Sequence, residues 1–241
     1  MITRAFLSFL LIGLLAACGD TDNTTTDTDT AADLDTAVAD DVVIDDIVTD
    51  ETVDDLLTDD VVPDDAAGLV ITRPAVLETT LGAITIGLYG EEMPVTSANF
   101  ESYIEEDFFA GLIFHRVIPG FVAQGGGYDQ TLTEKTPHDP IDFERTTVAK
   151  HVKYAVSMAR TSNIDSATSQ FFIAFDILPH LDYTSDDDFF STSKFPCAVF
   201  GIVTDGFEVV DAMEAVETGA QGGMEDVPVT PIVITGTHFA D

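Results

Sequence analysis

The amino-acid sequence predicts an all-β domain, closed or sandwiched, with two helical caps. After residue 72 the chain carries a series of short apolar runs, and several alternate with polar residues as a half-buried strand does. Only two segments in this part show the spacing of an amphipathic helix. Many short strands with few helices are typical of barrels and sandwiches. We therefore expect one folded domain over residues 73–241, a length suited to a single core.

The domain is expected to open with a hairpin and a helix. Alternation over Val76–Tyr89, interrupted at Leu81-Gly82, predicts two antiparallel strands joined by a turn. Pro94 then favours a helix over residues 94–109, because proline fits the first helical turn. The apolar residues that share one face of this helix are Phe100, Tyr103, Ile104 and Phe108.

The remaining elements follow from shorter patterns. Strands are expected at Leu112–Arg116, Tyr154–Ala159, Phe171–Phe175, Ala198–Val203 and 231–234. A second helix is expected over Phe207–Val216, where Val209, Ala212 and Met213 fall on one side.

The charge balance limits the partners. Nine Lys and Arg against 44 Asp and Glu give a net charge of −35. Nucleic-acid binding needs clustered basic residues for the phosphates, so we expect no nucleic-acid partner. The same balance disfavours binding to an anionic membrane surface.

The first 17 residues have the pattern of a signal peptide. Arg4 precedes the apolar run Ala5–Ala17, whose thirteen residues are too few to span a bilayer, which needs about 20. The run ends in LAAC and resembles the lipobox of bacterial lipoproteins, which implies lipidation of Cys18 and anchoring in the cell envelope. Gly19, where Asp would favour retention in the inner membrane, favours the outer membrane. The alternative is an ordinary signal peptide with a coincidental cysteine.

Residues 18–72 are expected to be a disordered acidic tether. Positions 19–72 hold eighteen Asp or Glu and no Lys or Arg. The acidic pairs recur about every five residues, which fits neither a helix nor a strand, so no continuous apolar face can form. The alternative is a calcium-binding acidic repeat, although the glycine-bearing loop of an EF-hand is missing.

Residue types alone leave the function open. The run FHRVIPGFVAQGGG, residues 114–127, could be a surface strand followed by a tight bend. No G-x-S-x-G, G-x-G-x-x-G or Walker motif is present, and the five histidines lack metal-ligand spacing, so no metal site is expected. If Cys18 carries lipid, Cys197 has no disulfide partner in the chain.

Four segments in fixed order point to a family. FHRVIPGFVAQGG (114–126), SMARTSNIDSATSQFFI (157–173), LD (181–182) and AVFGIV (198–203) resemble the cyclophilin-type peptidyl-prolyl cis-trans isomerases, the bacterial branch most closely. The resemblance implies a closed eight-stranded antiparallel barrel capped by two α-helices. It also implies rotation of X-Pro bonds in proline-containing polypeptides, with no cofactor, and we expect a monomer.

The family's site is carried over residue by residue. The resemblance assigns catalysis to Arg116, with Phe114 and His115 completing the wall and rim. An apolar socket for the proline ring would consist of Phe121, Val122, Phe172 and Leu181. Gln124 and Gln170 would hydrogen-bond Arg116 and the substrate carbonyl. The substrate backbone would pair with Ala159 and Arg160.

Several positions depart from the family pattern. His180 stands where an aromatic residue is common, Cys197 stands where His or Tyr is, and Val122 replaces a commoner methionine. The connection over 183–196 is longer than usual and is either a solvated loop or a substrate-selecting lid. These departures leave a second hypothesis open, in which the domain binds proline-containing segments as a non-catalytic chaperone or scaffold.

Overall fold

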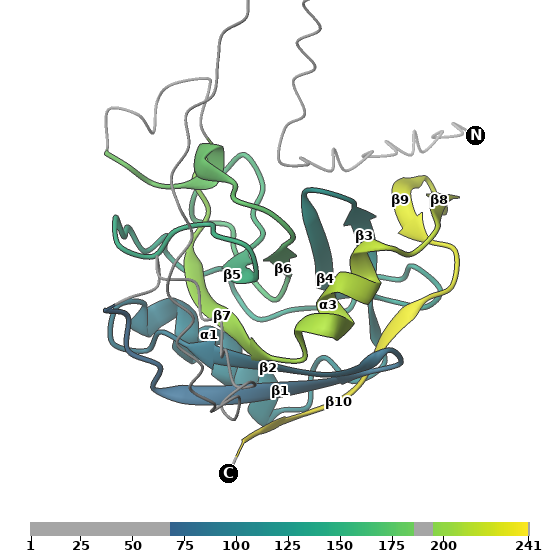
Figure 1. The fold of residues 1–241 in the computed structure, drawn as a ribbon, viewed down its shortest axis with the longest axis horizontal. Coiled ribbons are helices and arrows are strands. Elements are labelled where there is room, and N and C mark those ends of the chain that lie inside the picture. The colour runs from purple at the N-terminus through teal and green to yellow at the C-terminus, as the bar shows by residue number, and fades with distance from the viewer. Residues whose placement is uncertain (1–67, 186–194, 241) are drawn as a thin grey trace, which may run out of the picture. The chain divides into compact units, whose positions relative to one another are not determined.

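The computed structural model describes residues 68–185 and 195–240 (Figure 1). Eight strands in this part close into an antiparallel barrel in the order β1-β10-β3-β4-β6-β5-β7-β2. The barrel strands are β1 (Arg73–Thr79), β2 (Gly82–Leu88), β3 (Leu112–Ile118), β4 (Val122–Asp129), β5 (Ala155–Met158), β6 (Phe171–Ala174), β7 (Val199–Asp205) and β10 (Ile232–Phe239). The predicted eight-stranded barrel with two helices is confirmed.

The first hairpin forms where the alternation predicts it. β1 and β2 pair from Arg73↔Leu88 to Thr79↔Gly82. The Thr79 hydroxyl donates to the Gly82 carbonyl at 2.7 Å and accepts from the Leu81 amide at 3.1 Å, which fixes the turn. Contacts with the domain begin before β1: Leu69 packs against the core, and the Thr72 amide donates to the Leu88 carbonyl at 2.9 Å.

Helix α1 (Pro94–Glu105) ends earlier than its apolar pattern predicts, at Glu105 rather than Phe109. Asp107 adopts a φ of 49°, which a continuing helix cannot contain. The Phe108 and Phe109 rings then fold back over Tyr103, at centroid distances of 4.6 and 5.6 Å. Their apolar character therefore belongs to the packing after the helix, not to the helix itself.

Helix α3 (Phe207–Glu214) begins and ends near its predicted bounds. Val209, Val210 and Met213 face inward. Figure 1 shows α3 beside β3 and β4, with which it is in contact.

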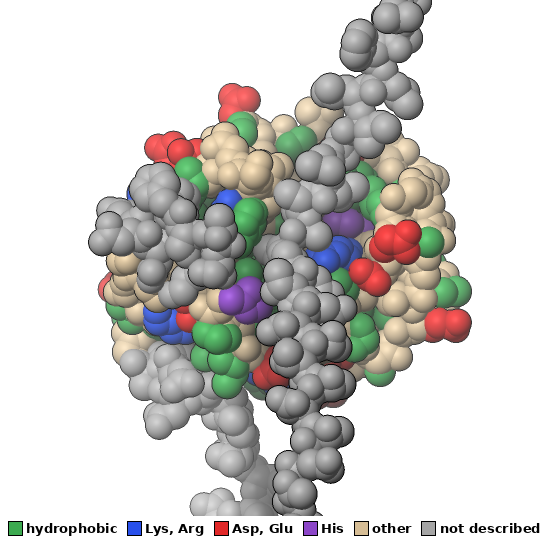
Figure 2. All heavy atoms as spheres, turned by 90° about the horizontal axis from the view of Figure 1, so that it is seen from above, with side chains coloured by type: hydrophobic (Ala, Val, Ile, Leu, Met, Phe, Trp, Pro, Cys, Tyr) green, Lys and Arg blue, Asp and Glu red, His purple; other side chains and the backbone are tan. Residues whose placement is uncertain are grey.

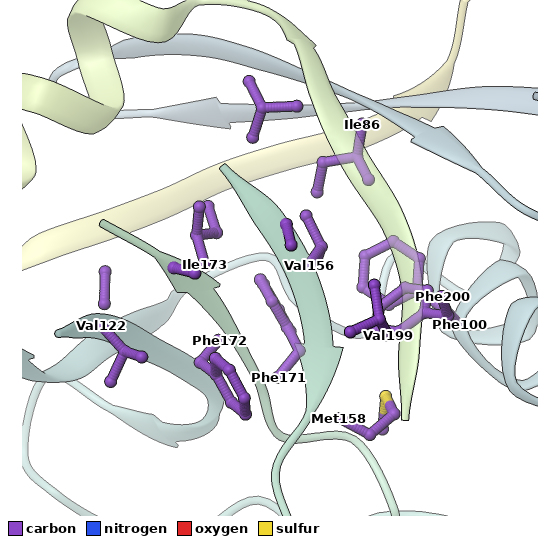
Figure 3. Packing of buried hydrophobic residues seen from close by; sticks show 14 of the residues in the cluster. Ile86, Phe100, Val122, Val156, Met158, Phe171, Phe172, Ile173, Val199 and Phe200 are labelled. Atoms are coloured by element: carbon purple, nitrogen blue, oxygen red, sulfur yellow. The ribbon is translucent and has the colours of Figure 1, made fainter. Parts of the chain in front are cut away.

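Aromatic rings in the hydrophobic core join helix α1 to the barrel strands. Phe100 of α1 contacts Phe171 of β6 edge-on at 5.3 Å and Phe200 of β7 at 5.0 Å. Offset and edge-on ring pairs are the favoured arrangements in a core. Figure 3 shows these rings with Ile86 and Val156 from the neighbouring strands.

A two-stranded hairpin, β8 (Thr218–Gln221) and β9 (Met224–Pro228), was not expected from the sequence and packs beside β3. No helix in the described ranges is long and apolar enough to cross a bilayer. The expected signal peptide, Cys18 and most of the tether fall in residues 1–67, outside the described residues.

Candidate active site

Four side chains from four adjacent strands form a row on one face of the sheet. Arg116 of β3 pairs with Gln124 of β4, Gln124 pairs with Phe172 of β6, and Phe172 pairs with Ser157 of β5. Residues directly opposite each other in antiparallel strands project from the same face. The fold thus brings a guanidinium, an amide and an aromatic ring from distant segments side by side.

A bulge in β3 turns Arg116 onto this face. Phe114 pairs with Gly125 and Arg116 with Gln124, so two steps in β3 match one step in β4. Adjacent positions of a strand point to opposite faces, so Phe114 points away from the row. Phe114 is fully buried, and its ring meets Phe171 edge-on at 5.8 Å. Phe114 therefore supports the sheet from the core side instead of forming the wall assigned to it.

The glycines of β4 give the room that this arrangement needs. A Cβ on Gly127 would lie 2.7 Å from the Gln170 side chain. A Cβ on Gly126, whose φ is +83°, would lie 2.8 Å from the Ser169 carbonyl oxygen. Side chains at these two positions would displace Gln170 and the backbone that precedes β6.

Gln124 and Gln170 are joined to each other. The Gln124 Nε2 donates to the Gln170 Oε1 at 3.0 Å. The Gln170 carbonyl accepts from the Ala159 amide at 2.9 Å. Among the described residues, no ion pair or hydrogen bond holds the Arg116 guanidinium, so its donors are available.

Apolar side chains lie next to the row. Val122 precedes Gln124 by two positions, on the same face, and Figure 3 shows Phe172 on the Val122 side of β6. Phe121 is partly exposed, and its ring centre lies 5.9 Å from the Arg116 Cζ. Leu181, in a 3₁₀ turn over Pro179–Leu181, is fully buried. We call Phe121, Val122, Phe172 and Leu181 the apolar cluster; all four belong to or pack against the hydrophobic core.

The comparison with known families decides what this arrangement is. Residues 75–239 match the family described as Cyclophilin type peptidyl-prolyl cis-trans isomerase/CLD. The chain belongs to the cyclophilin-type peptidyl-prolyl cis-trans isomerases. It is therefore an enzyme that isomerises X-Pro peptide bonds. This result favours catalysis over the second hypothesis, a non-catalytic binding module.

Relatives and solved structures agree with the assignment. The chain is 40% identical over 180 residues to a peptidyl-prolyl cis-trans isomerase of Acinetobacter baylyi, covering 71% of this chain and 91% of that protein. It is 36% identical over 163 residues to peptidyl-prolyl cis-trans isomerase B of Escherichia coli, covering 68% and 97%. A Cryptosporidium parvum cyclophilin crystallised in the presence of the dipeptide Ala-Pro shares the fold, with a TM-score of 0.59, 24% identity, and coverage of 70% and 99%.

The Arg160 side chain of this cyclophilin binds to neighbouring backbone carbonyls and to an aromatic ring. Its Nε donates to the Pro196 carbonyl at 2.7 Å, its Nη1 donates to the Thr161 carbonyl at 2.9 Å, and its Cζ lies 3.7 Å from the Phe195 ring centre. These contacts fasten the end of the long 183–196 connection beside β5. Residues 186–194 of that connection lie outside the described residues, so its reading as a lid or a solvated loop stays a prediction.

His115 is buried rather than exposed at the rim of the site. It is 2% exposed, and its ring meets Tyr128 edge-on at 4.7 Å. Burial, with a smaller contribution from the Arg116 charge, lowers the pKa of His115 to about 4. His115 is therefore neutral near pH 7 and is shielded from a substrate.

A buried hydrogen-bond chain that sequence reasoning missed lies behind Phe172. The His151 Nδ1 is 2.8 Å from the Asp182 Oδ1, and the His151 Nε2 is 3.0 Å from the Ser157 Oγ. The His151 ring stacks on Phe172 at 5.8 Å. Ser157 and the His151 side chain are fully buried, so these hydrogen-bonded residues cannot reach a substrate as a hydrolytic triad does. They instead support the Phe172 ring.

The Asp182 carboxylate is the charged end of this chain. Burial opposes its ionisation, but hydrogen bonds from His151 outweigh burial and hold the pKa of Asp182 below its usual value. Burial also lowers the pKa of His151, against the opposing effect of Asp182. The three hydrogen-bonded residues lie in different segments, so no local sequence pattern indicates that they meet.

On one face of the cyclophilin domain, charged and apolar side chains are mixed. Figure 2 views the domain from the top of Figure 1, and its described atoms show basic side chains and histidines interspersed with acidic and hydrophobic ones. Within the described ranges, no three His, Cys, Asp or Glu side chains are grouped as a metal site requires.

Proposed function

We propose that Arg116 catalyses X-Pro isomerisation by donating an N–H to the proline nitrogen in the twisted bond. Amide resonance sets a barrier of about 18–20 kcal/mol to this rotation. When the bond twists, the nitrogen regains its lone pair and becomes an acceptor. A donor aimed at that nitrogen interacts more strongly with the transition state than with the planar amide, and this difference accelerates rotation.

The surroundings of Arg116 support this role. An arginine is protonated at every relevant pH and presents several donors in a plane. Arg73 shows the alternative, since its guanidinium bonds to Glu101 at 3.2 Å and Glu105 at 3.1 Å. No described carboxylate engages Arg116 in this way. The Arg116–Gln124–Phe172 row is the single observation that carries the proposal.

The neighbouring groups would hold the substrate. The apolar cluster would take the proline ring, so that the residue before proline turns while the ring stays fixed. Gln124 and Gln170 would bond to substrate amide groups through the donors and acceptors that their mutual bond leaves free. The strand end at Ala159 and Arg160 would offer backbone groups to an extended peptide.

The test compares three variants of the full chain in an assay of cis-to-trans conversion of a tetrapeptide with one Ala-Pro bond. Arg116→Ala should lower kcat/KM about 10²–10³-fold, as loss of one directed donor does. Arg116→Lys should recover little, because an ammonium lacks the planar fork. The control, Arg73→Ala, removes a guanidinium bound to α1 and should leave kcat/KM unchanged. Wild-type kcat/KM in Arg116→Ala would overturn the mechanism.

We also propose that the enzyme works outside the cytoplasm, anchored by lipid on Cys18, on exported proteins as they fold. The apolar run before LAAC and the polar, acidic stretch after it support this location. Residues 18–72 would separate the anchor from the barrel by on the order of 40 Å for fifty flexible residues. Gly19, not Asp, follows the cysteine and supports the outer membrane.

Radiolabelled palmitate incorporation in a Gram-negative host tests the anchor. The full chain should incorporate label and pellet with membranes. Cys18→Ala should do neither, whereas Cys197→Ala should behave as wild type. Equal labelling of wild type and Cys18→Ala would contradict the anchor, and recovery of Gly19→Asp in the same membrane as wild type would contradict the sorting.

A further inference from the structure

The turn between β3 and β4 has a defined form. The Phe121 amide donates to the Ile118 carbonyl at 3.0 Å, which closes a four-residue turn with Pro119 and Gly120 at its centre. Gly120 has a φ of +71°. Proline at the second position and a positive φ at the third are the signature of a type II turn.

A carboxylate from α3 holds the central peptide of this turn. The Gly120 amide donates to the Glu214 Oε1 at 2.7 Å, across 94 positions of sequence. This amide belongs to the peptide that rotates when a type II turn converts to type I. A charge-assisted hydrogen bond to it therefore opposes that rotation.

The position of Glu214 in α3 indicates that its role is the contact with the turn and not the stability of the helix. Glu214 is the last residue of α3. A negative charge there interacts unfavourably with the helix dipole, so the residue does not serve helix stability. The Gly120 amide is the one hydrogen-bond partner of its side chain among the described residues.

The turn sets the position of Phe121, the residue that follows it. The Phe121 carbonyl accepts from the Phe175 amide at 2.9 Å, so its backbone is fastened on the β6 side. Its ring stacks on His180 at 6.0 Å and lies 5.9 Å from the Arg116 Cζ. Without the Glu214 contact the turn that precedes Phe121 would lose one of its fixed points, so the Phe121 ring would be held less firmly beside Arg116.

We propose that Glu214 is a positioning residue of the isomerase site, which holds the turn over 118–121 so that Phe121 can take the proline ring. The inference rests on the role proposed for Phe121. Loss of the bond should weaken binding of substrate and transition state alike, because the ring contacts both. Uniform loss raises KM and leaves kcat nearly unchanged.

The experiment uses Glu214→Ala, Glu214→Gln and a matched control, Glu217→Ala, in the full chain. Glu217 is exposed, and its side chain forms no hydrogen bond or ion pair within the described residues. The probe is the Ala-Pro tetrapeptide, followed by kcat and KM and, independently of turnover, by an NMR titration. Hydrogen exchange of the Gly120 amide reports the turn itself, and the melting temperature reports the fold.

Glu214→Ala should raise KM and the dissociation constant about three- to tenfold, with kcat within twofold of wild type and faster exchange at Gly120. Glu214→Gln keeps an acceptor oxygen and should recover most of the affinity, and Glu217→Ala should match wild type. Unchanged affinity in Glu214→Ala, equal loss in both Glu214 variants, or a lower melting temperature without faster Gly120 exchange would overturn the inference. Failure of wild type to bind or turn over the peptide would instead overturn the proposed site.

Discussion

The Gln124 Nε2 lies 3.0 Å from the Gln170 Oε1, and this bond joins the strand that faces Arg116 to the segment that leads into Phe172. Each glutamine restricts the rotamers of the other, so both amides are oriented before a peptide arrives. Preorganised donors and acceptors need no rearrangement during reaction. The two glutamines thus provide oriented polar groups beside the apolar cluster.

The first prediction is that Gln124 and Gln170 act as a unit in catalysis. Gln124→Ala and Gln170→Ala should each lower kcat/KM about tenfold, since each leaves the other amide unoriented. The double variant should lose less than the product of the two, with a coupling free energy of about 1 kcal/mol. A double-variant kcat/KM equal to the product of the single losses would contradict the coupling.

A second prediction concerns Gly127, where a Cβ would lie 2.7 Å from the Gln170 side chain. Gln170 can move, so Gly127→Ala should fold normally but lower kcat/KM about tenfold by displacing that amide. The control is Gly236→Ala, because no atom lies within 4 Å of a Cβ there. Equal kcat/KM in the two variants would show that the Gln170 position is not critical.

The strands that the sequence predicted contain apolar alternation or a continuous apolar run, and those it missed contain neither. β4 contains three consecutive glycines, Gly125–Gly127, which have low strand propensity and suggested a bend. β8 is exposed over most of its length and has no apolar face. The predicted last strand stopped at Ile234, although β10 continues to Phe239 through polar residues that pair with β1. Pairing partners, which fix these strands, are not visible in a local pattern.

The site was predictable in its residues and less so in their orientation. The resemblance singled out Arg116, Gln124 and Phe172, which the structure places in one row. It could not show that the bulge at His115 turns Phe114 into the core. Strand periodicity alone would put residues 114 and 116 on one face, and only the register with β4 corrects this.

A third prediction concerns Glu144, which caps α1 from a distant loop. Its two carboxylate oxygens accept from the Val95 amide at 2.9 Å, the Thr96 amide at 2.6 Å and the Thr96 hydroxyl at 2.6 Å. These satisfy amides of the first helical turn that lack intrahelical partners, and they place a negative charge at the positive end of the helix. Glu144→Ala should lower the free energy of unfolding by about 1–2 kcal/mol.

Chemical denaturation of Glu144→Ala, Glu144→Gln and Glu225→Ala measures this effect. Glu225 is exposed on β9 and controls for the change in net charge. Glu144→Gln should lie between wild type and Glu144→Ala, because its amide oxygen still accepts. A Glu144→Ala stability equal to that of Glu225→Ala would rule out the cap.

The fourth prediction is an acid sensitivity that comes from His115. Its pKa is lowered from 6.5 to about 4 in the folded chain, mainly by burial. Between these values the unfolded chain binds a proton that the folded chain does not, so the free energy of unfolding falls as pH drops from 6.5 to 4. One pKa unit corresponds to about 1.4 kcal/mol, so this group can remove about 3 kcal/mol. Above pH 6.5 its contribution does not change.

Urea denaturation at pH 7, 5.5 and 4.5 separates His115 from other acid-sensitive groups. Burial also lowers the pKa of His151, and Asp182 loses its stabilising charge in acid, but both remain in His115→Leu. That variant should therefore lose less stability than wild type between pH 7 and 4.5. At pH 7 it should be close to wild type, because leucine is apolar and its removal of the buried polar ring offsets the space that it leaves unfilled. His238→Leu, at an exposed position of β10, should keep the wild-type dependence on pH, and the same dependence in His115→Leu would show that His115 protonates freely in the folded chain.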